Sequence, residues 1–200
     1  MADTRLAAGR KGNAYFITRR FDRLAGNQRR HVHSVAGLAH ANFRMPDFDY
    51  LELLKLSDLL TRSHAEKLEL FRRMTFNIVS GNRDDHTRNF AFMMEPGGQW
   101  SNAPAYDLTY NRGLGGHHSM TVQGKGKEFV LDDLLKLAHR VSVPRAVAMR
   151  LIGEVSDAAS SWNSAARHYP IPKEQIAEIQ QHIDRSRIRL RLARSAPGVP

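Results

Sequence analysis

Cysteine is absent from the 200-residue sequence, which excludes disulfide bonds and thiolate metal sites. Long apolar runs are absent as well, since no stretch approaches the roughly 20 residues that span a bilayer. The first residues, MADTRLAAGRKGNAYF, contain no apolar segment of the kind found in signal peptides. We therefore expect a cytoplasmic protein with no membrane partner.

Acidic residues are few relative to basic ones. Thirty Lys and Arg residues against twenty Asp and Glu residues give a net charge of +10 at pH 7. Such a surface attracts polyanions, including nucleic acid, nucleotides and acidic proteins. Hydrophobic residues make up 42% of the chain, which is enough for one domain with its own core. Charge and composition therefore leave the function open.

The spacing of apolar residues predicts the central helices. Leucines recur at helical intervals over 50–60, so we expect a buried helix there. Ser63 and Glu66 match a capping box, which predicts that a second helix begins at this point. Gly81 is expected to end that helix. A shorter helix is expected over 34–43.

Strand signals occur at two places in the first half of the chain. Residues 14–23 alternate aromatic or β-branched side chains with polar ones, which predicts a strand. Apolar residues at 90–94 are followed by the turn sequence EPGG at 95–98, and apolar character resumes at 99–100. This second pattern predicts a β-hairpin.

The second half of the chain reads as helical. A glycine-rich stretch over 111–127 is expected to form a long loop. Helices are expected over 130–140, 144–168 and 173–194, where apolar residues again recur at helical spacing. The predicted fold class is therefore mainly α with a small β-hairpin.

The polar octet NRDDHTRN at 82–89 is the strongest candidate for a functional site. Asp84 and Asn89 stand five residues apart in it, and Asp107 follows beyond the predicted hairpin. Phosphoryl transfer by kinases needs a carboxylate for the substrate hydroxyl, and an amide and a second carboxylate for Mg²⁺. The Asp-x-x-x-x-Asn spacing matches the catalytic loop of kinases.

Histidines are the other candidate metal ligands. His31 and His33 share one face of an extended segment, and His117 and His118 lie in the glycine-rich loop. Zinc sites need three or four converging ligands, and no helix carries a His-Glu-x-x-His pair. We therefore interpret the histidines as ordinary polar residues, with His86 as the exception because of its place in the polar octet.

Three segments together resemble a known family. GNRDDHTRN at 81–89 resembles the GNxDDHxxN motif of HipA-type serine/threonine kinase toxins, and PAYDL at 104–108 resembles a second motif of that family. RFDR at 20–23 resembles their hinge segment. The motifs occur in the family's order, and the resemblance runs from the start of the chain to about Trp162.

The resemblance implies a role for each polar residue of the site. Asp84 would be the catalytic base, and Asn89 and Asp107 would bind Mg²⁺. His86 and Arg88 would brace the loop or contact phosphate. The chemistry implied is transfer of the ATP γ-phosphate to a serine or threonine of a protein.

The resemblance also implies a nucleotide site, with ATP and Mg²⁺ as cofactors. Arg19, Arg20 and Phe21 would border the adenine. Members of the family are considerably longer, and their N-terminal lobe carries a phosphate-covering loop and an ATP-binding lysine. The sequence shows no pattern of that kind, so we expect little or no kinase activity from this chain alone.

The expected layout follows from the same comparison. Residues 1–30 would form the hinge strand and a remnant of the N-terminal lobe, and residues 31–195 would form a helical C-terminal lobe like that of protein kinases. Residues 196–200 would form a disordered tail. The N-terminal lobe would be missing.

The expected partners are those of the family. They are a protein substrate, typically a glutamate–tRNA ligase, and a small helix-turn-helix antitoxin through which DNA would be contacted only indirectly. One alternative is a pseudokinase remnant that acts as a basic binding module for an antitoxin or nucleic acid. Another is a basic helical nucleic-acid binder unrelated to kinases, for which the arginine-rich stretch 185–194 would be the contact surface.

Overall fold

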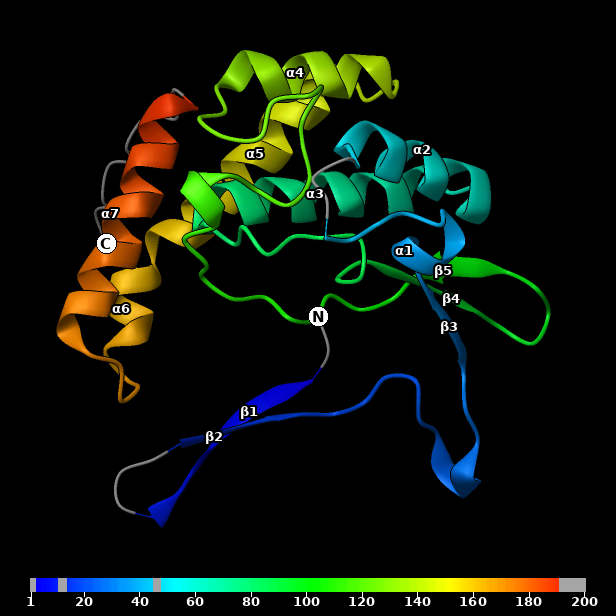
Figure 1. Cartoon of the computed structure of the whole chain (residues 1–200), viewed down its shortest axis with the longest axis horizontal. Helices are drawn as coiled ribbons and strands as arrows, with labels where there is room; N and C mark the ends of the chain where they lie inside the picture. Colours follow the sequence, from blue (N-terminus) through cyan, green and yellow to red (C-terminus); the bar gives the residue numbers. More distant parts are fainter. Residues whose placement is uncertain (1–2, 11–13, 45–47, 191–200) are drawn as a thin grey trace.

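The protein is mainly helical and contains two small antiparallel sheets (Figure 1). The computed structural model describes residues 3–10, 14–44 and 48–190. The predicted tail at 196–200 and the end of the helix predicted over 173–194 lie outside these residues. Within them, no helix is both long and apolar enough to cross a membrane. The predicted mainly-α class is confirmed, although the β content exceeds one hairpin.

Helix α3 (His64–Ser80) lies at the centre of the fold. At its start the Ser63 hydroxyl accepts a hydrogen bond from the Glu66 backbone N–H at 3.4 Å, as the capping pattern predicts. The Glu66 carboxylate does not complete the box, because it accepts the backbone N–H of Asn102 at 2.9 Å instead. Gly81 ends the helix with φ 75°, the left-handed conformation that glycine adopts at low cost.

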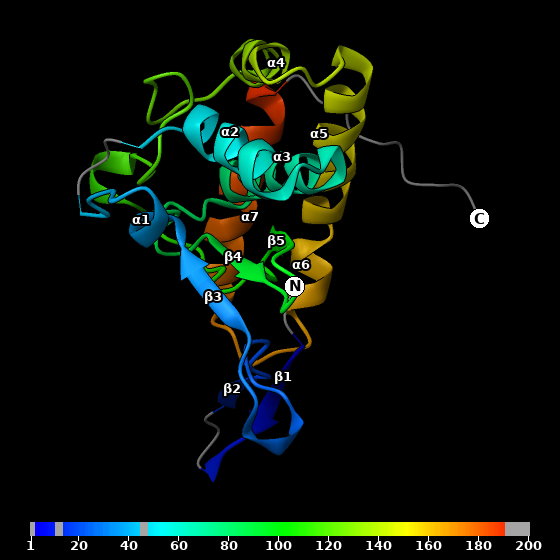
Figure 2. The same ribbon diagram turned by 90° about the vertical axis from the view of Figure 1, so that its right-hand side faces the viewer.

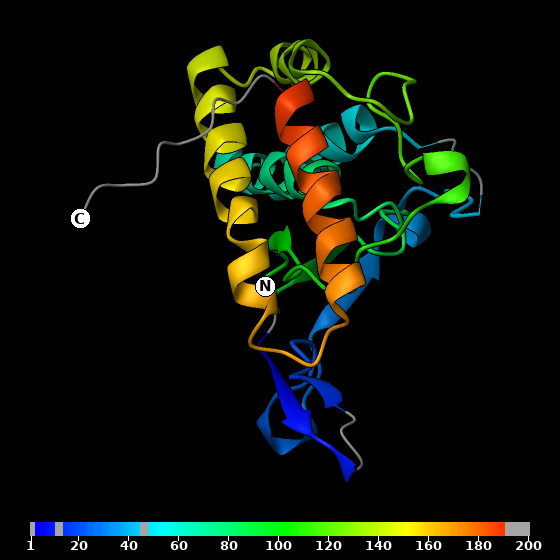
Figure 3. The same cartoon turned by 90° about the vertical axis from the view of Figure 1, so that its left-hand side faces the viewer.

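The other helices gather around α3. Helices α2, α5 and α7 contact α3 directly, and α4 packs on α5. Figure 3 shows α5 and α7 side by side, with α3 crossing behind them. These helices are α1 (Val35–Leu38), α2 (Tyr50–Thr61), α4 (Leu131–Arg140), α5 (Arg145–Ser160), α6 (Trp162–Ala166) and α7 (Lys173–Arg189).

The single helix predicted over 144–168 is wrong, because the chain divides there into α5 and α6. The hydroxyl of Ser160 donates to the carbonyl of Asp157 at 2.6 Å, and the hydroxyl of Ser161 donates to the carbonyl of Ala158 at 2.8 Å. Serine hydroxyls that bond nearby carbonyls compete with regular helical pairing. The helix therefore ends at this serine pair and restarts at once.

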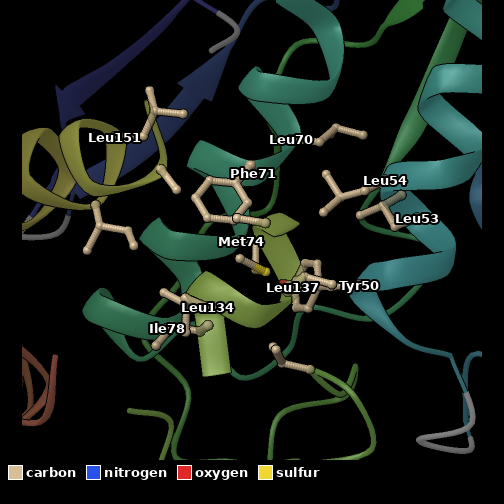
Figure 4. Packing of buried hydrophobic residues seen from close by; sticks show 14 of the residues in the cluster. Tyr50, Leu53, Leu54, Leu70, Phe71, Met74, Ile78, Leu134, Leu137 and Leu151 are labelled. Carbon is tan, nitrogen blue, oxygen red and sulfur yellow. The ribbon is translucent and has the colours of Figure 1, made fainter. Parts of the chain in front are cut away.

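The core lies between α2, α3, α4 and α5. Phe71 and Met74 of α3 meet Tyr50 and Leu53 of α2 and Leu134 of α4, and all five side chains are fully buried (Figure 4). Burial of each large apolar side chain stabilises the fold by about 1.5–3 kcal/mol relative to leaving it in water. The leucine spacing that predicts α2 thus supplies one wall of the core.

A three-stranded antiparallel sheet lies beside the helices. It has the order β3 (His31–Ser34), β4 (Ala91–Met94), β5 (Trp100–Asn102). The predicted hairpin is confirmed as β4 and β5, whereas the pairing of β3 with β4 was not predicted. Figure 2 shows the sheet between the helices and a second, separate hairpin. The 82–89 loop therefore begins at the end of α3 and ends at β4 of this sheet.

The helix predicted over 34–43 is only one turn long. Ser34 caps α1 by accepting the N–H of Gly37 at 3.3 Å, but His40 adopts φ 51°. A non-glycine residue in the left-handed region cannot continue a right-handed helix. The prediction is therefore correct in type and wrong in length.

The second hairpin extends away from the helical body (Figure 1). It consists of β1 (Thr4–Ala8) and β2 (Ala14–Thr18), paired antiparallel. The strand predicted over 14–23 ends at Thr18, and its partner β1 was not predicted. Tyr15 and Phe16 are exposed, because no helix covers this hairpin within the part of the chain that the structure describes.

Two leucines of α2 test this account of the core. Leu53 is 0% exposed and Leu59 is 73% exposed. Leu53→Ala should lower the free energy of unfolding by about 2–5 kcal/mol, because it removes buried methyl groups and leaves a cavity. Leu59→Ala should change it by no more than about 0.5 kcal/mol. Equal urea midpoints for the two variants would contradict the assignment of the buried face.

Candidate functional site

A buried carboxylate anchors the polar loop at 82–89. Asp85 is 0% exposed and accepts hydrogen bonds from the Tyr50 hydroxyl at 2.7 Å and from the backbone N–H of Ser119 at 2.9 Å. His118 Nδ1 lies 2.9 Å from the same carboxylate, and the backbone N–H of Met120 lies at 3.4 Å. Burying a charge is costly unless such partners surround it. Asp85 therefore ties the loop to α2 and to the 118–120 segment.

The anchor continues into α3 through amide side chains. Asn77 Nδ2 donates to the Tyr50 hydroxyl at 3.0 Å, and Asn82 Nδ2 donates to Asn77 Oδ1 at 3.0 Å. Burial and the nearby Asp85 charge raise the pKa of Tyr50 well above its usual value, so Tyr50 stays a neutral donor. The start of the loop is thus fixed by a connected polar network rather than by one contact.

Asp84, which directly precedes Asp85 in the sequence, is exposed where Asp85 is buried. Its side chain is 42% exposed, and its Oδ1 lies 3.8 Å from His86 Nε2. Its backbone carbonyl accepts a hydrogen bond from Asn89 Nδ2 at 2.8 Å. Three of the predicted site residues therefore lie in one turn of chain, with Asp84 open to solvent.

The residue before Asp107 contacts the 84–89 loop. The Tyr106 hydroxyl donates to the Arg88 carbonyl at 2.6 Å, which joins the 106 segment to the loop. Burial, together with the Asp107 charge, raises the pKa of Tyr106 to about 12. Asp107 itself has φ 53°, a strained conformation for a residue that is not glycine.

The free oxygens at this site fit a magnesium ion. In the described part of the chain, neither the Asp107 carboxylate nor Asn89 Oδ1 has a hydrogen-bond or ion-pair partner. No cluster of three or more His, Asp or Glu side chains suitable for a metal occurs among those residues. Mg²⁺ commonly takes only one or two protein carboxylates and completes its shell with water and substrate phosphates. The amide and carboxylate oxygens of Asn89 and Asp107 are thus donors of the kind that Mg²⁺ prefers.

Arg88 and His86 pack on the same aromatic ring. The Arg88 guanidinium carbon lies 3.6 Å from the centroid of the Phe43 ring, and the His86 ring meets Phe43 edge-on at 5.6 Å. An arginine over an aromatic face is stabilised by the charge distribution of the ring. Phe43 therefore supports the outer side of the loop.

The residues predicted to border the adenine are only partly connected to this site. Phe21 packs against Tyr106 with ring centroids 5.9 Å apart. The Arg20 guanidinium donates two hydrogen bonds to the Asp22 carboxylate, at 2.8 Å and 2.5 Å. The Arg19 backbone N–H donates its hydrogen bond to a residue outside the site. In the described residues, neither arginine side chain forms a hydrogen bond or an ion pair with the 84–89 loop.

Several residues of the site were not identified from the sequence. They are the buried partners and the bridging tyrosine, namely Tyr50, Asn77, Tyr106 and His118. His118 was interpreted as an ordinary polar histidine, but it is buried against Asp85. Tyr106 carried a signal because it lies inside the PAYDL segment, whereas nothing in the sequence links Tyr50 or Asn77 to the loop.

Known proteins resemble the chain in sequence and in fold. The family of HipA-like C-terminal domains matches residues 1–162. A comparison with curated proteins finds no match. A chain from the toxin–antitoxin complex of HipA, HipB and operator DNA of Shewanella oneidensis MR-1 is 18% identical with a TM-score of 0.72, over 94% of this chain and 51% of that one.

A second solved structure shares the fold more distantly. The proinflammatory kinase CtkA of Helicobacter pylori is 15% identical with a TM-score of 0.52, over 94% of this chain and 73% of that chain. Identities this low show a common fold and no more. The chain spans about half the length of the Shewanella protein that it resembles.

Adjacent aspartates give a test of the anchor. Asp85→Ala should lower the free energy of unfolding by about 3 kcal/mol or more, because it leaves buried donors without an acceptor. Asp84→Ala should change stability by no more than about 0.5 kcal/mol, since that side chain is 42% exposed. Urea unfolding measures both variants. Similar midpoints would show that Asp85 does not hold the loop.

His182 of α7 makes stability depend on pH. Burial, and then the charge of Arg83, lower the pKa of His182 from its usual 6.5 to about 4. The unfolded chain therefore binds more protons between these values, so stability should fall as pH drops from about 6.5 toward 4. His182→Gln should make this fall shallower. His139→Gln, which changes an exposed histidine, should not, and equal pH profiles for wild type and His182→Gln would contradict the assignment.

Proposed function

Because the chain belongs to the family of HipA-like C-terminal domains, as its motifs predict, we propose that it is the part of a serine/threonine kinase that positions the substrate hydroxyl and the Mg²⁺ of ATP. The observation that carries this proposal is the hydrogen bond from Tyr106 to the Arg88 carbonyl. It joins the residue before Asp107 to the loop that contains Asp84 and Asn89, and so supports the proposal that the three side chains act together, although the sequence separates them by a hairpin.

Each polar residue has a distinct role in this proposal. Asp84, exposed and next to His86, accepts the proton of the attacking hydroxyl and orients it. Asn89 Oδ1 and the Asp107 carboxylate would hold the metal, which when bound with ATP would offset the charge of the β- and γ-phosphates. The Asp85 network keeps these groups in position before substrate arrives, and such positioning accounts for much of kinase catalysis.

The nucleotide is proposed to lie toward the hinge side of the site. Phe21 is the residue of the 1–30 segment that contacts the site, through Tyr106. We propose that Arg19, Arg20 and Phe21 border the adenine, with the Arg20–Asp22 ion pair shaping the segment. We propose that efficient transfer needs a second lobe, because the resemblance assigns the phosphate-covering loop and the ATP-binding lysine to the N-terminal lobe of the family.

The proposed biological partners follow from the family. The substrate is a serine or threonine of another protein, with a glutamate–tRNA ligase as the first candidate. The Shewanella structure contains HipB and operator DNA, which supports a helix-turn-helix antitoxin as a partner and DNA as an indirect one. The net charge of +10 would favour the contacts with the antitoxin and with DNA. We propose that these contacts take place in the cytoplasm.

A titration with Mg–ATP tests the metal site. A ligand that binds only the folded state raises the melting temperature, and the rise grows with the ratio of ligand concentration to dissociation constant. The wild-type chain should be stabilised by Mg–ATP, and Asp107→Asn and Asn89→Ala should lose that shift. Asp84→Asn should keep the shift but lower phosphoryl transfer by roughly 10²–10⁴-fold in an assembly that shows transfer.

The control is Glu52→Gln, an exposed carboxylate on α2, which should change neither property. An Mg–ATP shift that survives in Asp107→Asn would contradict the assignment of the metal ligand. Full transfer by Asp84→Asn would contradict its role as base. The absence of any shift in the wild type would favour a binding module without catalysis.

A further inference from the structure

A small cavity borders the polar loop at 82–89. Its volume is about 200 Å³, and its walls come from α3, α7 and the 111–129 segment. Arg83 lines it, directly before Asp84 in the chain. His118 also lines it, and its Nδ1 lies 2.9 Å from Asp85. The cavity therefore shares a wall with the anchor of the candidate site without being part of it.

Arg83 contributes a positive charge that is not neutralised. Its guanidinium donates to the carbonyls of Asn111 and Arg112 at 3.3 and 3.1 Å, and it lies 3.3 Å from His182 Nδ1. Its Nε is buried and has no hydrogen-bond partner in the described structure. An unsatisfied buried donor of this kind is costly, and it is readily satisfied by an anion.

Lys127 adds a second such charge to the lining of the cavity. Its ammonium group lies 3.5 Å from the Gly115 carbonyl, which is a weak contact. In the described part of the chain, neither Lys127 nor Arg83 forms an ion pair with a carboxylate. Two cations therefore line the cavity without a counter-charge.

The acidic residue at the cavity is a weak competitor for these cations. Glu128 is the carboxylate among the lining residues, and it lies 3.7 Å from Arg189 with its side chain 67% exposed. Ion pairs between exposed side chains stabilise a protein little. The low pKa of His182 has the same origin, since the Arg83 charge and burial both disfavour its protonation. The cavity is thus electropositive and partly desolvated.

We propose that this cavity binds a dianionic phosphate group, held by Arg83, Lys127 and Arg189. Arginine presents paired N–H groups that match phosphate oxygens, and lysine adds a point charge. At about 200 Å³ the cavity is smaller than the 300–1,000 Å³ of typical ligand pockets, so it fits a phosphate group and not a nucleotide. Gly115 and Gly116, which have no side chain to block entry, form part of its rim.

Binding there would also act on the anchor. A dianion beside His118 and Arg83 would restrain both the 82–89 loop and the 118–120 segment. These segments are already joined, because the Arg83 carbonyl accepts hydrogen bonds from the Ser119 N–H at 3.1 Å and the Ser119 hydroxyl at 2.9 Å. The dianion can be free inorganic phosphate or a phosphorylated serine or threonine side chain. A phosphorylated side chain would make the cavity a regulatory site for the neighbouring loop.

Thermal-shift titrations without Mg²⁺ or nucleotide test the proposal, with potassium chloride added to equalise ionic strength. Inorganic phosphate and an N-acetyl phosphoserine amide are the two ligands, at pH 7.5. Both should raise the melting temperature, with a rise that starts near the dissociation constant and then grows with the logarithm of the ligand concentration. Lys127→Gln and Arg189→Gln should each weaken the apparent affinity about tenfold, while Lys55→Gln, an exposed residue of α2, should leave it unchanged.

The two ligands distinguish the source of the phosphate. Tighter binding of phosphoserine would identify a phosphorylated side chain, and equal or tighter binding of inorganic phosphate would identify the free ion. No rise in melting temperature above that in the salt-matched chloride control, or a rise that is equal in Lys127→Gln and Lys55→Gln, would overturn the proposal. Because Mg–ATP is absent, this outcome is independent of whether the chain is part of a kinase.

Discussion

The burial of the Asp85 carboxylate is the constraint on which the rest of the site depends. A charge with 0% exposure is tolerable only because a tyrosine, a histidine and backbone N–H groups surround it. These partners come from α2 and from the segment after the hairpin, so the contact joins parts of the chain far apart in sequence. With Asp85 fixed, its neighbour Asp84 is 42% exposed to solvent, as the proposed role of a base for a substrate hydroxyl requires.

Much of the fold could be predicted because its signals are local. The leucine spacing of α2, the cap at Ser63 and the glycine at 81 each act within a few residues, and the structure agrees with them. The order of the three motifs was sufficient to identify the family, which matches residues 1–162. Local signals failed where neighbouring side chains redirect the chain, as at the serine pair between α5 and α6.

The long-range contacts of the site could not be predicted in the same way. No pattern around Tyr50 shows that its hydroxyl meets Asp85, because the two are 35 residues apart. The strand pairing of β1 and of β3 likewise depends on partners distant in sequence. The left-handed backbone of Asp107 and the grouping of Arg83 and Lys127 around one cavity are likewise properties of the folded chain and have no local sequence signal.

We propose that residues 84–89 and residues 106–108 meet around one divalent cation. Mn²⁺, added with a non-hydrolysable ATP analogue, broadens the NMR signals of amides close to the metal. We predict that the amide signals of residues 84–89 and of residues 106–108 broaden together at the same Mn²⁺ concentrations. The amide signals of the hairpin turn at 95–98 should persist. Broadening of one segment without the other would contradict this proposal.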